Sequence, residues 1–476
     1  MLFNSFHFLF FFIIVTVVYF SLAHNKRWIW LLLASCYFYM AFVPVYILIL
    51  AFTIVVDYYA GIYIEKSTGA RKKRFLIYSL ITNIGILCFF KYYNFLNDNL
   101  TAMLGIANMQ NPIPALKILL PIGLSFHTFQ AMSYTIEVYR GNQKAEQHFG
   151  IYALYVMFYP QLVAGPIERP QNLLHQFREK HYFDADRVSE GLKLMVWGLF
   201  KKLVIADRVG IFVDSAYNNY EQSSPMVLII ATIFFSFQVY CDFSGYSDIA
   251  IGTAKVMGYD LMTNFKRPVL AKSTGEFWKR WHISLSTWFK DYLYFPLGGN
   301  RVKLPRVCIN IMIVFLVSGL WHGSNWTFVI WGGINGFYLV FAMITKKQRE
   351  WLWNRTGIPS FRGLNICMNI GVTFLLIAFS RIFFRSESLY QAMAIIMKIF
   401  SFNGFAGEMN TIMLAYSCFA ILFLLIVEIR REFFPNLFSL SQHRKFAVRN
   451  FYYAVLVMLI LLIGVYDGGQ FIYFQF

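Results

Sequence analysis

The sequence has few charged residues and no clustered cysteines. Asp, Glu, Lys and Arg make up 14% of its 476 residues, whereas apolar residues make up 58%. The six cysteines are far apart and lie mostly in apolar stretches, so they indicate neither a disulfide framework nor a CxxC zinc site. Internal repeats, low-complexity tracts and a separate soluble domain are also absent from the sequence.

The apolar residues occur in long runs that short basic segments separate. Continuous runs such as residues 9–19 and 370–379 argue against a transmembrane β-barrel, whose strands alternate apolar and polar residues. Together with a mean hydropathy of +0.52, these runs predict an all-α polytopic membrane protein. By run length we expect about eleven spanning helices, plus shorter re-entrant and interfacial helices.

The net charge of +18 comes from 42 Lys and Arg against 24 Asp and Glu. The basic residues are dispersed through connections that flank the apolar runs, as the positive-inside rule predicts. We therefore expect membrane lipid rather than nucleic acid around this chain. Some of the charge can also attract an anionic donor such as coenzyme A or an acidic carrier protein.

The N-terminal run, residues 6–23, is expected to be a retained first span. No Lys or Arg precedes Lys26, so the run lacks the basic region of a cleavable signal, and the N-terminus would lie outside the cytoplasm. Residues 28–61 are long enough for a helical pair with a bend near Pro44. The basic cluster at residues 71–74 would then lie in the cytoplasm.

The next segments continue this topology. Residues 75–96 would span outward, residues 97–114 lack Lys and Arg and suit the outer face, and residues 116–138 would return. Pro121 and Gly123 are expected to bend this returning helix.

A different kind of segment begins at residue 151. Residues 151–163 are too short to span, and residues 159–170 contain three prolines and a glycine, which preclude a continuous helix. Non-helical backbone at membrane depth is tolerated where protein groups or a water-filled cavity supply partners for its N–H and C=O groups. We therefore expect a re-entrant element that lines a cavity.

Two further spans are expected at residues 192–213 and 227–239. The second runs into Asp242 and Asp248, whose carboxylates need partners or water beside apolar sequence. Helix capping or pairing with a lysine is as plausible for them as a role in a site.

Residues 264–306 are basic and aromatic. Ser273 and Glu276 have the spacing of a capping box, which marks the start of a helix. Helical spacing from there predicts one amphipathic interfacial helix, with an apolar face made of Trp278, Trp281, Leu285 and Trp288 and with basic flanks made of Lys279, Arg280 and Lys290. Such tryptophans and basic residues usually anchor a helix at the membrane surface. This helix would carry His282 near the cytoplasmic edge.

His322 interrupts the apolar stretch 307–345, inside the sequence Ser318-Gly319-Leu320-Trp321-His322-Gly323-Ser324-Asn325-Trp326. A helix that leaves the basic edge at Arg306 would bring it about 24 Å into a hydrocarbon core of about 30 Å. An ionisable side chain at that depth marks a functional site by default.

Histidines at these two positions suit acyl transfer, in which one imidazole takes the proton of an acceptor hydroxyl. A buried structural histidine is the plainer alternative, although the glycines and polar residues around His322 favour function. A metal site is not supported, because no HExxH is present and no carboxylate has ligand spacing. Ser318, one turn before His322, lacks the GxSG-type context of a serine nucleophile.

The remaining spans are expected at residues 328–344, 366–382, 413–427 and 451–465. We describe the chain as one integral-membrane domain, residues 1–476, with N-terminal spans (1–150), a catalytic core with re-entrant elements (151–345) and C-terminal spans (346–476).

Several segments together resemble the membrane-bound O-acyltransferase family, and within it the bacterial branch that includes the alginate O-acetylation membrane protein. The matching segments run in order over most of the chain: Phe158-Tyr159-Pro160-Gln161-Leu162-Val163-Ala164-Gly165-Pro166-Ile167, Asp242-Phe243-Ser244-Gly245-Tyr246-Ser247-Asp248, the segment from Phe277 to Trp288, the segment from Tyr294 to Asn300, and Ser318-Gly319-Leu320-Trp321-His322-Gly323.

The resemblance implies a funnel-shaped helical fold, a catalytic His322 and a second functional residue at His282. It also implies that an acyl group, most simply acetyl, passes from a cytoplasmic donor to an extracytoplasmic acceptor. In this branch a separate periplasmic protein commonly takes part in the delivery.

We therefore interpret the chain as an O-acetyltransferase of the bacterial inner membrane that modifies a polysaccharide such as alginate, peptidoglycan or another exopolysaccharide. His322 would act as general base or acyl relay, and His282 would assist on the donor side. Substrate binding is assigned to Asp242, Trp278, Arg280, Trp281, Asn300 and Trp321. The expected donor is acetyl-CoA or an acyl carrier, and neither a metal nor a tightly bound cofactor is expected.

Two alternatives remain open at this point. One is an acyltransferase of the teichoic-acid D-alanylation type, which takes its acyl group from a carrier protein. The other is a non-enzymatic transporter or lipid-linked sugar flippase, which would tolerate the loss of one imidazole better than an acyltransferase would.

Overall fold

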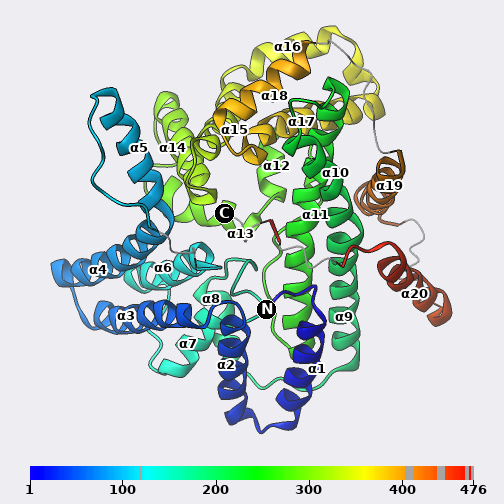
Figure 1. The fold of residues 1–476 in the computed structure, drawn as a ribbon. Coiled ribbons are helices and arrows are strands. Elements are labelled where there is room, and N and C mark those ends of the chain that lie inside the picture. The colour runs from blue at the N-terminus through cyan, green and yellow to red at the C-terminus, as the bar shows by residue number, and fades with distance from the viewer. Residues whose placement is uncertain (117–120, 402–410, 437–444, 467–470, 473–476) are drawn as a thin grey trace. The chain divides into compact units, whose positions relative to one another are not determined.

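The computed structural model describes residues 1–116, 121–401, 411–436, 445–466 and 471–472. Within these residues the chain forms helices and no β-strand (Figure 1). The predicted all-α polytopic membrane class is confirmed. The described chain divides into two compact units, residues 1–195 with 246–262, and residues 196–245 with 263–472.

Eight helical segments of the described chain are long and apolar enough to cross a membrane. They are Pro44–Lys66, Gly69–Ile106, Pro225–Met257, Leu304–His322, Trp326–Ile344, Arg362–Arg385, Thr411–Phe433 and Phe446–Ile463. Two shorter apolar helices, Phe6–Ser21 and Leu389–Ser401, accompany them. Our estimate of about eleven spans thus corresponds to eight full-length segments and shorter apolar helices.

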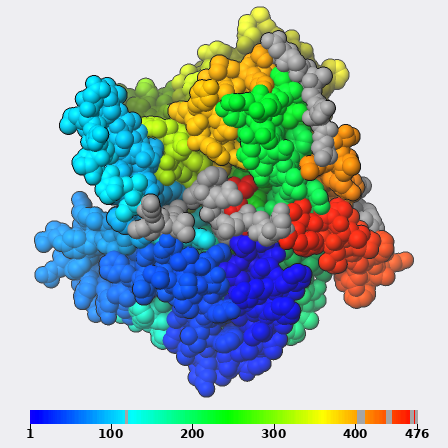
Figure 2. Space-filling model, in the orientation of Figure 1, coloured from blue at the N-terminus to red at the C-terminus, as the bar shows by residue number. Residues whose placement is uncertain are grey.

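The first unit begins with α1 (Phe6–Ser21) and α2 (His24–Met40), followed by η1 (Pro44–Tyr46) and α3 (Ile47–Lys66). The helical pair predicted with a bend near Pro44 is confirmed, and the chain changes direction there through η1 rather than within one continuous helix. Helices α1 to α4 form the blue surface in Figure 2, and their exposed side chains include large apolar residues such as Phe10, Phe52 and Ile81. An apolar exterior of this kind suits contact with lipid.

Helix α4 (Gly69–Leu87) continues through a π-helical turn, η2 (Cys88–Tyr92), into α5 (Tyr93–Ile106). Asp57 of α3 is fully buried. Its carboxylate accepts hydrogen bonds from Ser79 at 2.6 Å and from Asn83 at 2.9 Å, both on α4. These polar contacts tie α3 to α4 and satisfy a carboxylate that would otherwise be costly in a membrane.

Helix α6 (Leu124–Arg140) begins later than the sequence suggested. Pro121 and Gly123 precede the helix and do not bend it, so that prediction is wrong; residues 117–120 lie outside the described part. Gly123 has a left-handed φ of 78°, and a Cβ there would lie 3.0 Å from the Cα of Val163. Glycine is therefore required both by the backbone conformation and by the close approach of the segment after α7.

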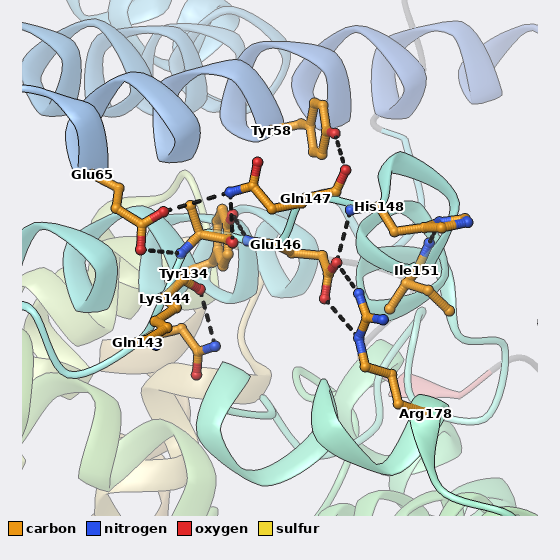
Figure 3. A network of polar contacts seen from close by, with 11 residues as sticks. Tyr58, Glu65, Tyr134, Gln143, Lys144, Glu146, Gln147, His148, Ile151 and Arg178 are labelled. Atoms are coloured by element: carbon orange, nitrogen blue, oxygen red, sulfur yellow. Dashed lines mark hydrogen bonds and ion pairs between the residues drawn. The ribbon is translucent and has the colours of Figure 1, made fainter.

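The connection from α6 to α7 (Phe149–Met157) is fixed by polar contacts (Figure 3). The Glu146 carboxylate accepts from the His148 backbone N–H at 2.8 Å and pairs with Arg178, while the Glu146 N–H donates to the Tyr134 hydroxyl at 2.9 Å. Glu65 of α3 accepts from the Ala145 N–H at 3.2 Å. These bonds set where α7 begins and hence where the following turns lie.

The segment after α7 has the broken backbone that its prolines predict. Residues 159–165 form turns and are buried, and Gln130 and Gln161 both donate to the Tyr155 carbonyl, at 2.6 and 3.0 Å. Buried Glu168 accepts from the Met262 N–H at 2.6 Å, and burial raises the pKa of this carboxyl to about 7. Groups of the protein itself therefore form hydrogen bonds with this non-helical stretch.

The rest of the first unit contains α8 (Pro170–Leu173), η3 (His175–Arg178), the start of α9 (Ala185–Leu199) and residues 246–262. In the second unit, α9 continues through a π-helical segment, η4 (Phe200–Ala206), into α10 (Asp207–Asn218). Helix α11 (Pro225–Met257) extends through Asp242 and Asp248 and is therefore much longer than the predicted span at residues 227–239.

The basic, aromatic region differs most from prediction. It forms η5 (Pro268–Leu270), α12 (Thr274–Arg280), α13 (Ile283–Phe289) and η6 (Lys290–Tyr294). The Ser273 hydroxyl caps α12 by accepting from the Glu276 N–H at 3.2 Å, so the predicted helix start is confirmed. The prediction of one long amphipathic helix is wrong, because the helix is interrupted at Trp281 and His282.

Helices α14 (Leu304–His322) and α15 (Trp326–Ile344) form a hairpin, followed by α16 (Lys346–Arg355), η7 (Ile358–Ser360), α17 (Arg362–Arg385), α18 (Leu389–Ser401), α19 (Thr411–Phe433) and α20 (Phe446–Ile463). The predicted spans at residues 328–344, 366–382, 413–427 and 451–465 coincide with α15, α17, α19 and α20.

Candidate active site

His322 is the last residue of α14 and is 3% exposed. Aromatic rings surround its imidazole: the ring centre of Trp321 lies 4.9 Å away, that of Trp331 of α15 lies 5.0 Å away, and that of Phe384 of α17 lies 5.6 Å away. Three helices thus position this side chain in apolar surroundings.

The hairpin of α14 and α15 depends on glycines where the two helices meet. A Cβ at Gly319 would lie 2.3 Å from the Phe328 carbonyl oxygen, and one at Gly332 would lie 2.2 Å from the Phe315 carbonyl oxygen. Small residues let two membrane helices approach this closely. The close packing brings Trp331 of α15 against His322 at the end of α14.

His282 lies at the break between α12 and α13. Its φ of 43° and ψ of 54° are left-handed, a conformation that costs a non-glycine residue about 1–3 kcal/mol and is most often found at functional sites. The side chain is 1% exposed. On an interfacial helix at the cytoplasmic edge, His282 would be exposed to water. The structure buries it, so that expectation is wrong.

Asn264 holds this break together. Its side-chain oxygen lies 3.2 Å from His282 Nδ1 and accepts from the Ser284 hydroxyl at 2.9 Å, while its backbone carbonyl accepts from the Ile283 N–H at 2.9 Å. The Lys266 N–H donates to the Arg280 carbonyl at 2.9 Å, which ties the same two stretches of chain together a second time.

The two histidines face each other, with ring centres 6.5 Å apart. Phe243 of α11 packs edge-on against His282 at 4.6 Å, and Trp321 lies 6.0 Å from it. At this separation, both imidazoles can contact one small reacting group. From the sequence we expected the histidines at different depths, whereas the structure brings them into one buried pair.

Burial lowers the pKa of His282 well below its ordinary value, and nearby His322 lowers it further. Both causes disfavour the charged imidazolium. His282 is therefore held neutral, the state in which an imidazole nitrogen can accept a proton.

Comparison with known proteins identifies the family. The model of MBOAT, the membrane-bound O-acyltransferase family, matches residues 19–379. The chain belongs to the membrane-bound O-acyltransferase family. The resemblance inferred from its motifs is thereby confirmed, and the chain is an O-acyltransferase by family.

Individual relatives of this O-acyltransferase cover from about half to most of its length. It is 36% identical over 407 residues to the "Probable alginate O-acetylase AlgI" of Pseudomonas aeruginosa, covering 85% of this chain and 75% of the relative. It is 34% identical over 404 residues to the "Peptidoglycan O-acetyltransferase" of Helicobacter pylori, covering 79% and 74%. A "Teichoic acid D-alanyltransferase" of Streptococcus thermophilus is 28% identical over 242 residues, covering 48% and 58%.

The tryptophans assigned to substrate binding pack around the O-acyltransferase site. Trp321 contacts both histidines. Trp278 packs against Phe315 at 5.0 Å and Trp331 at 5.9 Å. Trp281 packs against Phe265 at 5.1 Å, and the Arg381 guanidinium lies 4.6 Å from its ring centre. Trp278 and Trp281 thus support the site from α12 and the adjoining break, and their substrate contacts stay a prediction.

Arg280 and Asn300 have partners within the protein. The Arg280 guanidinium pairs with Glu276 at 2.5 Å and with Glu432 of α19 at 2.7 Å. Asn300 accepts a hydrogen bond from the Tyr294 hydroxyl. The double ion pair gives Arg280 a structural role beside α19, and its predicted part in substrate binding stays a prediction.

Asp242 forms a buried ion pair. Lys202 Nζ lies 2.7 Å from its carboxylate and 2.8 Å from that of Asp207, and the Ile472 N–H donates to Asp242 at 2.8 Å. Pairing with a lysine, one of the two roles considered for Asp242, is thus what the structure shows. A substrate contact by the same carboxylate stays a prediction.

Several residues of the site were not singled out from the sequence: Asn264, Ser284, Phe243, Trp331 and Phe384. Phe243 and Ser284 lie within segments that carry the family resemblance, but nothing local assigns them a contact with a histidine. Asn264, Trp331 and Phe384 reach a histidine from other parts of the chain, which no local pattern reveals. In the described part of the chain, no group of three or more His, Cys, Asp or Glu side chains could hold a metal ion.

Proposed function

We propose that this O-acyltransferase moves an acyl group, with acetyl as the candidate, from a cytoplasmic donor to hydroxyl groups of an extracytoplasmic polysaccharide. The names of the Pseudomonas and Helicobacter relatives support a polysaccharide acceptor such as alginate or peptidoglycan. The observation that carries the proposal is the buried pair of His282 and His322, with ring centres 6.5 Å apart.

The pair suits general-base acyl transfer. His322 would take the proton of the acceptor hydroxyl while the hydroxyl oxygen attacks the carbonyl carbon of an acyl thioester. The carbon–sulfur bond then breaks, and the departing thiolate receives a proton. His282 would assist on the donor side. Exclusion of water around both rings would protect the thioester from hydrolysis.

The donor in this proposal is acetyl-CoA or an acyl carrier that binds for one turnover rather than tightly. The basic connections suit either anion. The runner-up function is D-alanylation from a carrier protein, supported by the less similar Streptococcus relative. We further propose that the protein lies in the bacterial inner membrane and delivers the acyl group with a periplasmic partner.

The experiment that tests this function compares a deletion strain with strains that carry the wild-type gene or an empty vector. Mild alkali would release ester-linked groups from the purified envelope and secreted polysaccharides, and acetate and D-alanine would be measured separately. We expect the deletion to lose acetate and the wild-type gene to restore it. Loss of D-alanine alone would select the runner-up, and loss of neither would refute acyl transfer to these polymers.

The proposed topology gives a second expected result. In a variant without its native cysteines, we expect an impermeant thiol reagent applied to intact spheroplasts to label Gln110→Cys but not Thr68→Cys. Both positions are exposed, so only their sides of the membrane differ in the proposal. Labelling after lysis provides the control for reactivity. Labelling of Thr68→Cys in intact spheroplasts would contradict a cytoplasmic basic cluster at residues 71–74.

A further inference from the structure

Asn264 is fully buried and contacts three consecutive residues of the break that carries His282. Its side-chain oxygen meets the His282 Nδ1 at 3.2 Å, the Ser284 N–H at 3.2 Å and the Ser284 hydroxyl at 2.9 Å. Its carbonyl binds the Ile283 N–H. One residue, through its side-chain oxygen and its backbone carbonyl, therefore fixes both the left-handed turn and the orientation of the imidazole.

The identity of the contacting atom decides the tautomer. A side-chain amide oxygen only accepts hydrogen bonds, so the His282 Nδ1 opposite it must carry the proton. In a neutral imidazole the other nitrogen, Nε2, then holds the lone pair. Ser284 donates to the same oxygen from both its backbone and its hydroxyl, which keeps the oxygen rather than the NH₂ group of Asn264 on this side.

The charge of the contacting group matters as well. Histidines in many sites are oriented by a carboxylate, which also stabilises the imidazolium. Here a neutral amide takes that position. His322 of α14 is a titratable group that faces His282, and the Arg381 guanidinium of α17 lies over the ring of the adjacent Trp281. Phe243 and Phe265 contribute apolar rings at 4.6 and 6.3 Å.

We propose that Asn264 is the positioning residue of the site: it fixes His282 with its proton on Nδ1 and its lone pair on Nε2, and as a neutral amide it leaves the imidazole uncharged. This inference rests on the proposed function only in assigning His282 a part in acyl transfer. The tautomer itself is a property of the resting protein and can be measured without donor or acceptor.

The test is ¹⁵N solid-state NMR of the full-length protein in lipid bilayers with ¹⁵N-labelled histidine. The chain has nine histidines, so the His282 signals would be assigned by difference from His282→Gln. At neutral pH we expect one neutral His282 species protonated on Nδ1. A species protonated on Nε2, or a charged imidazolium, would overturn the inference.

Three variants separate positioning from folding. Asn264→Ala should produce a mixture of the two neutral tautomers. Asn264→Asp keeps the acceptor oxygens but adds a negative charge, so it should raise the pKa of His282 by about 1–3. Ser284→Ala tests the other group near Nδ1, because the Ser284 hydroxyl lies 3.5 Å from His282 Nδ1 as well as 2.9 Å from the Asn264 oxygen. With Asn264 in place, we expect Nδ1 of His282 to keep its proton in this variant.

If Asn264→Ala does not insert, Asn264→Asp still decides the question. An unchanged His282 pKa in inserted Asn264→Asp would overturn the positioning role. The inference and the proposed function fail in different experiments. If His282→Gln keeps full acyl transfer, the function assigned to His282 is wrong even where the NMR result stands, whereas a different tautomer with an inactive His282→Gln would overturn the inference alone.

Discussion

His322→Gln should lower the rate of acyl transfer by about 10²- to 10⁴-fold, the usual cost of losing a general base. Glutamine keeps polarity and a similar length but has no group that titrates near neutral pH. The histidine lies among Trp321, Trp331 and Phe384 and is 3% exposed, so bulk water cannot readily replace it as the base. The measurement is the O-acetyl content of the polysaccharide per amount of inserted protein.

The control for this result is a second buried histidine. His127 of α6 is 1% exposed and hydrogen-bonds to Thr53 at 2.9 Å, in the other unit of the chain. His127→Gln should keep the wild-type rate of acyl transfer per amount of inserted protein, although it disturbs the buried hydrogen bond to Thr53. Near-normal acetylation by inserted His322→Gln would contradict the catalytic assignment.

His282→Gln should be about as damaging as His322→Gln. The sequence placed His282 near the cytoplasmic edge of the membrane, where water could partly replace a lost imidazole. The structure removes that premise, because the side chain is 1% exposed and its ring lies 6.5 Å from that of His322. A proton acceptor lost from such a site is not replaced by solvent.

Protein amount and donor dependence must be measured alongside this second variant. His282 also occupies a strained left-handed position, so its substitution can affect folding as well as acyl transfer. Quantifying the membrane-inserted protein separates a loss of acyl-transfer rate from a loss of folded protein. A rate at saturating donor within tenfold of wild type would contradict a shared site and restore the view that His282 only assists binding.

Local features of the fold could be predicted from the sequence because they depend on neighbouring residues. The Ser273 cap, the break near Pro44 and the turns at residues 159–165 follow from hydroxyl, proline and glycine at fixed positions. His322 could be recognised because an ionisable residue inside an apolar run is costly unless it is used.

Long-range contacts could not be predicted in the same way. Lys202, 40 residues away in the sequence, pairs with Asp242. Helix α11 therefore continues through Asp242, whereas the sequence suggested that the span ends before this carboxylate. The break at His282 was missed because helical spacing continues past it from Trp278 to Trp288. Asn264 stabilises that break from 18 residues away, which spacing alone does not reveal.

The most direct test of a catalytic histidine pair is the acyl-transfer rate of four purified proteins in proteoliposomes: wild type, His322→Gln, His282→Gln and the double variant. Residues that act as one unit are not additive in their effects on rate. We predict that each single variant loses about 10²- to 10⁴-fold and that the double variant is no slower than the slower single variant. Losses that multiply in the double variant, or a His322→Gln rate close to wild type, would contradict the account.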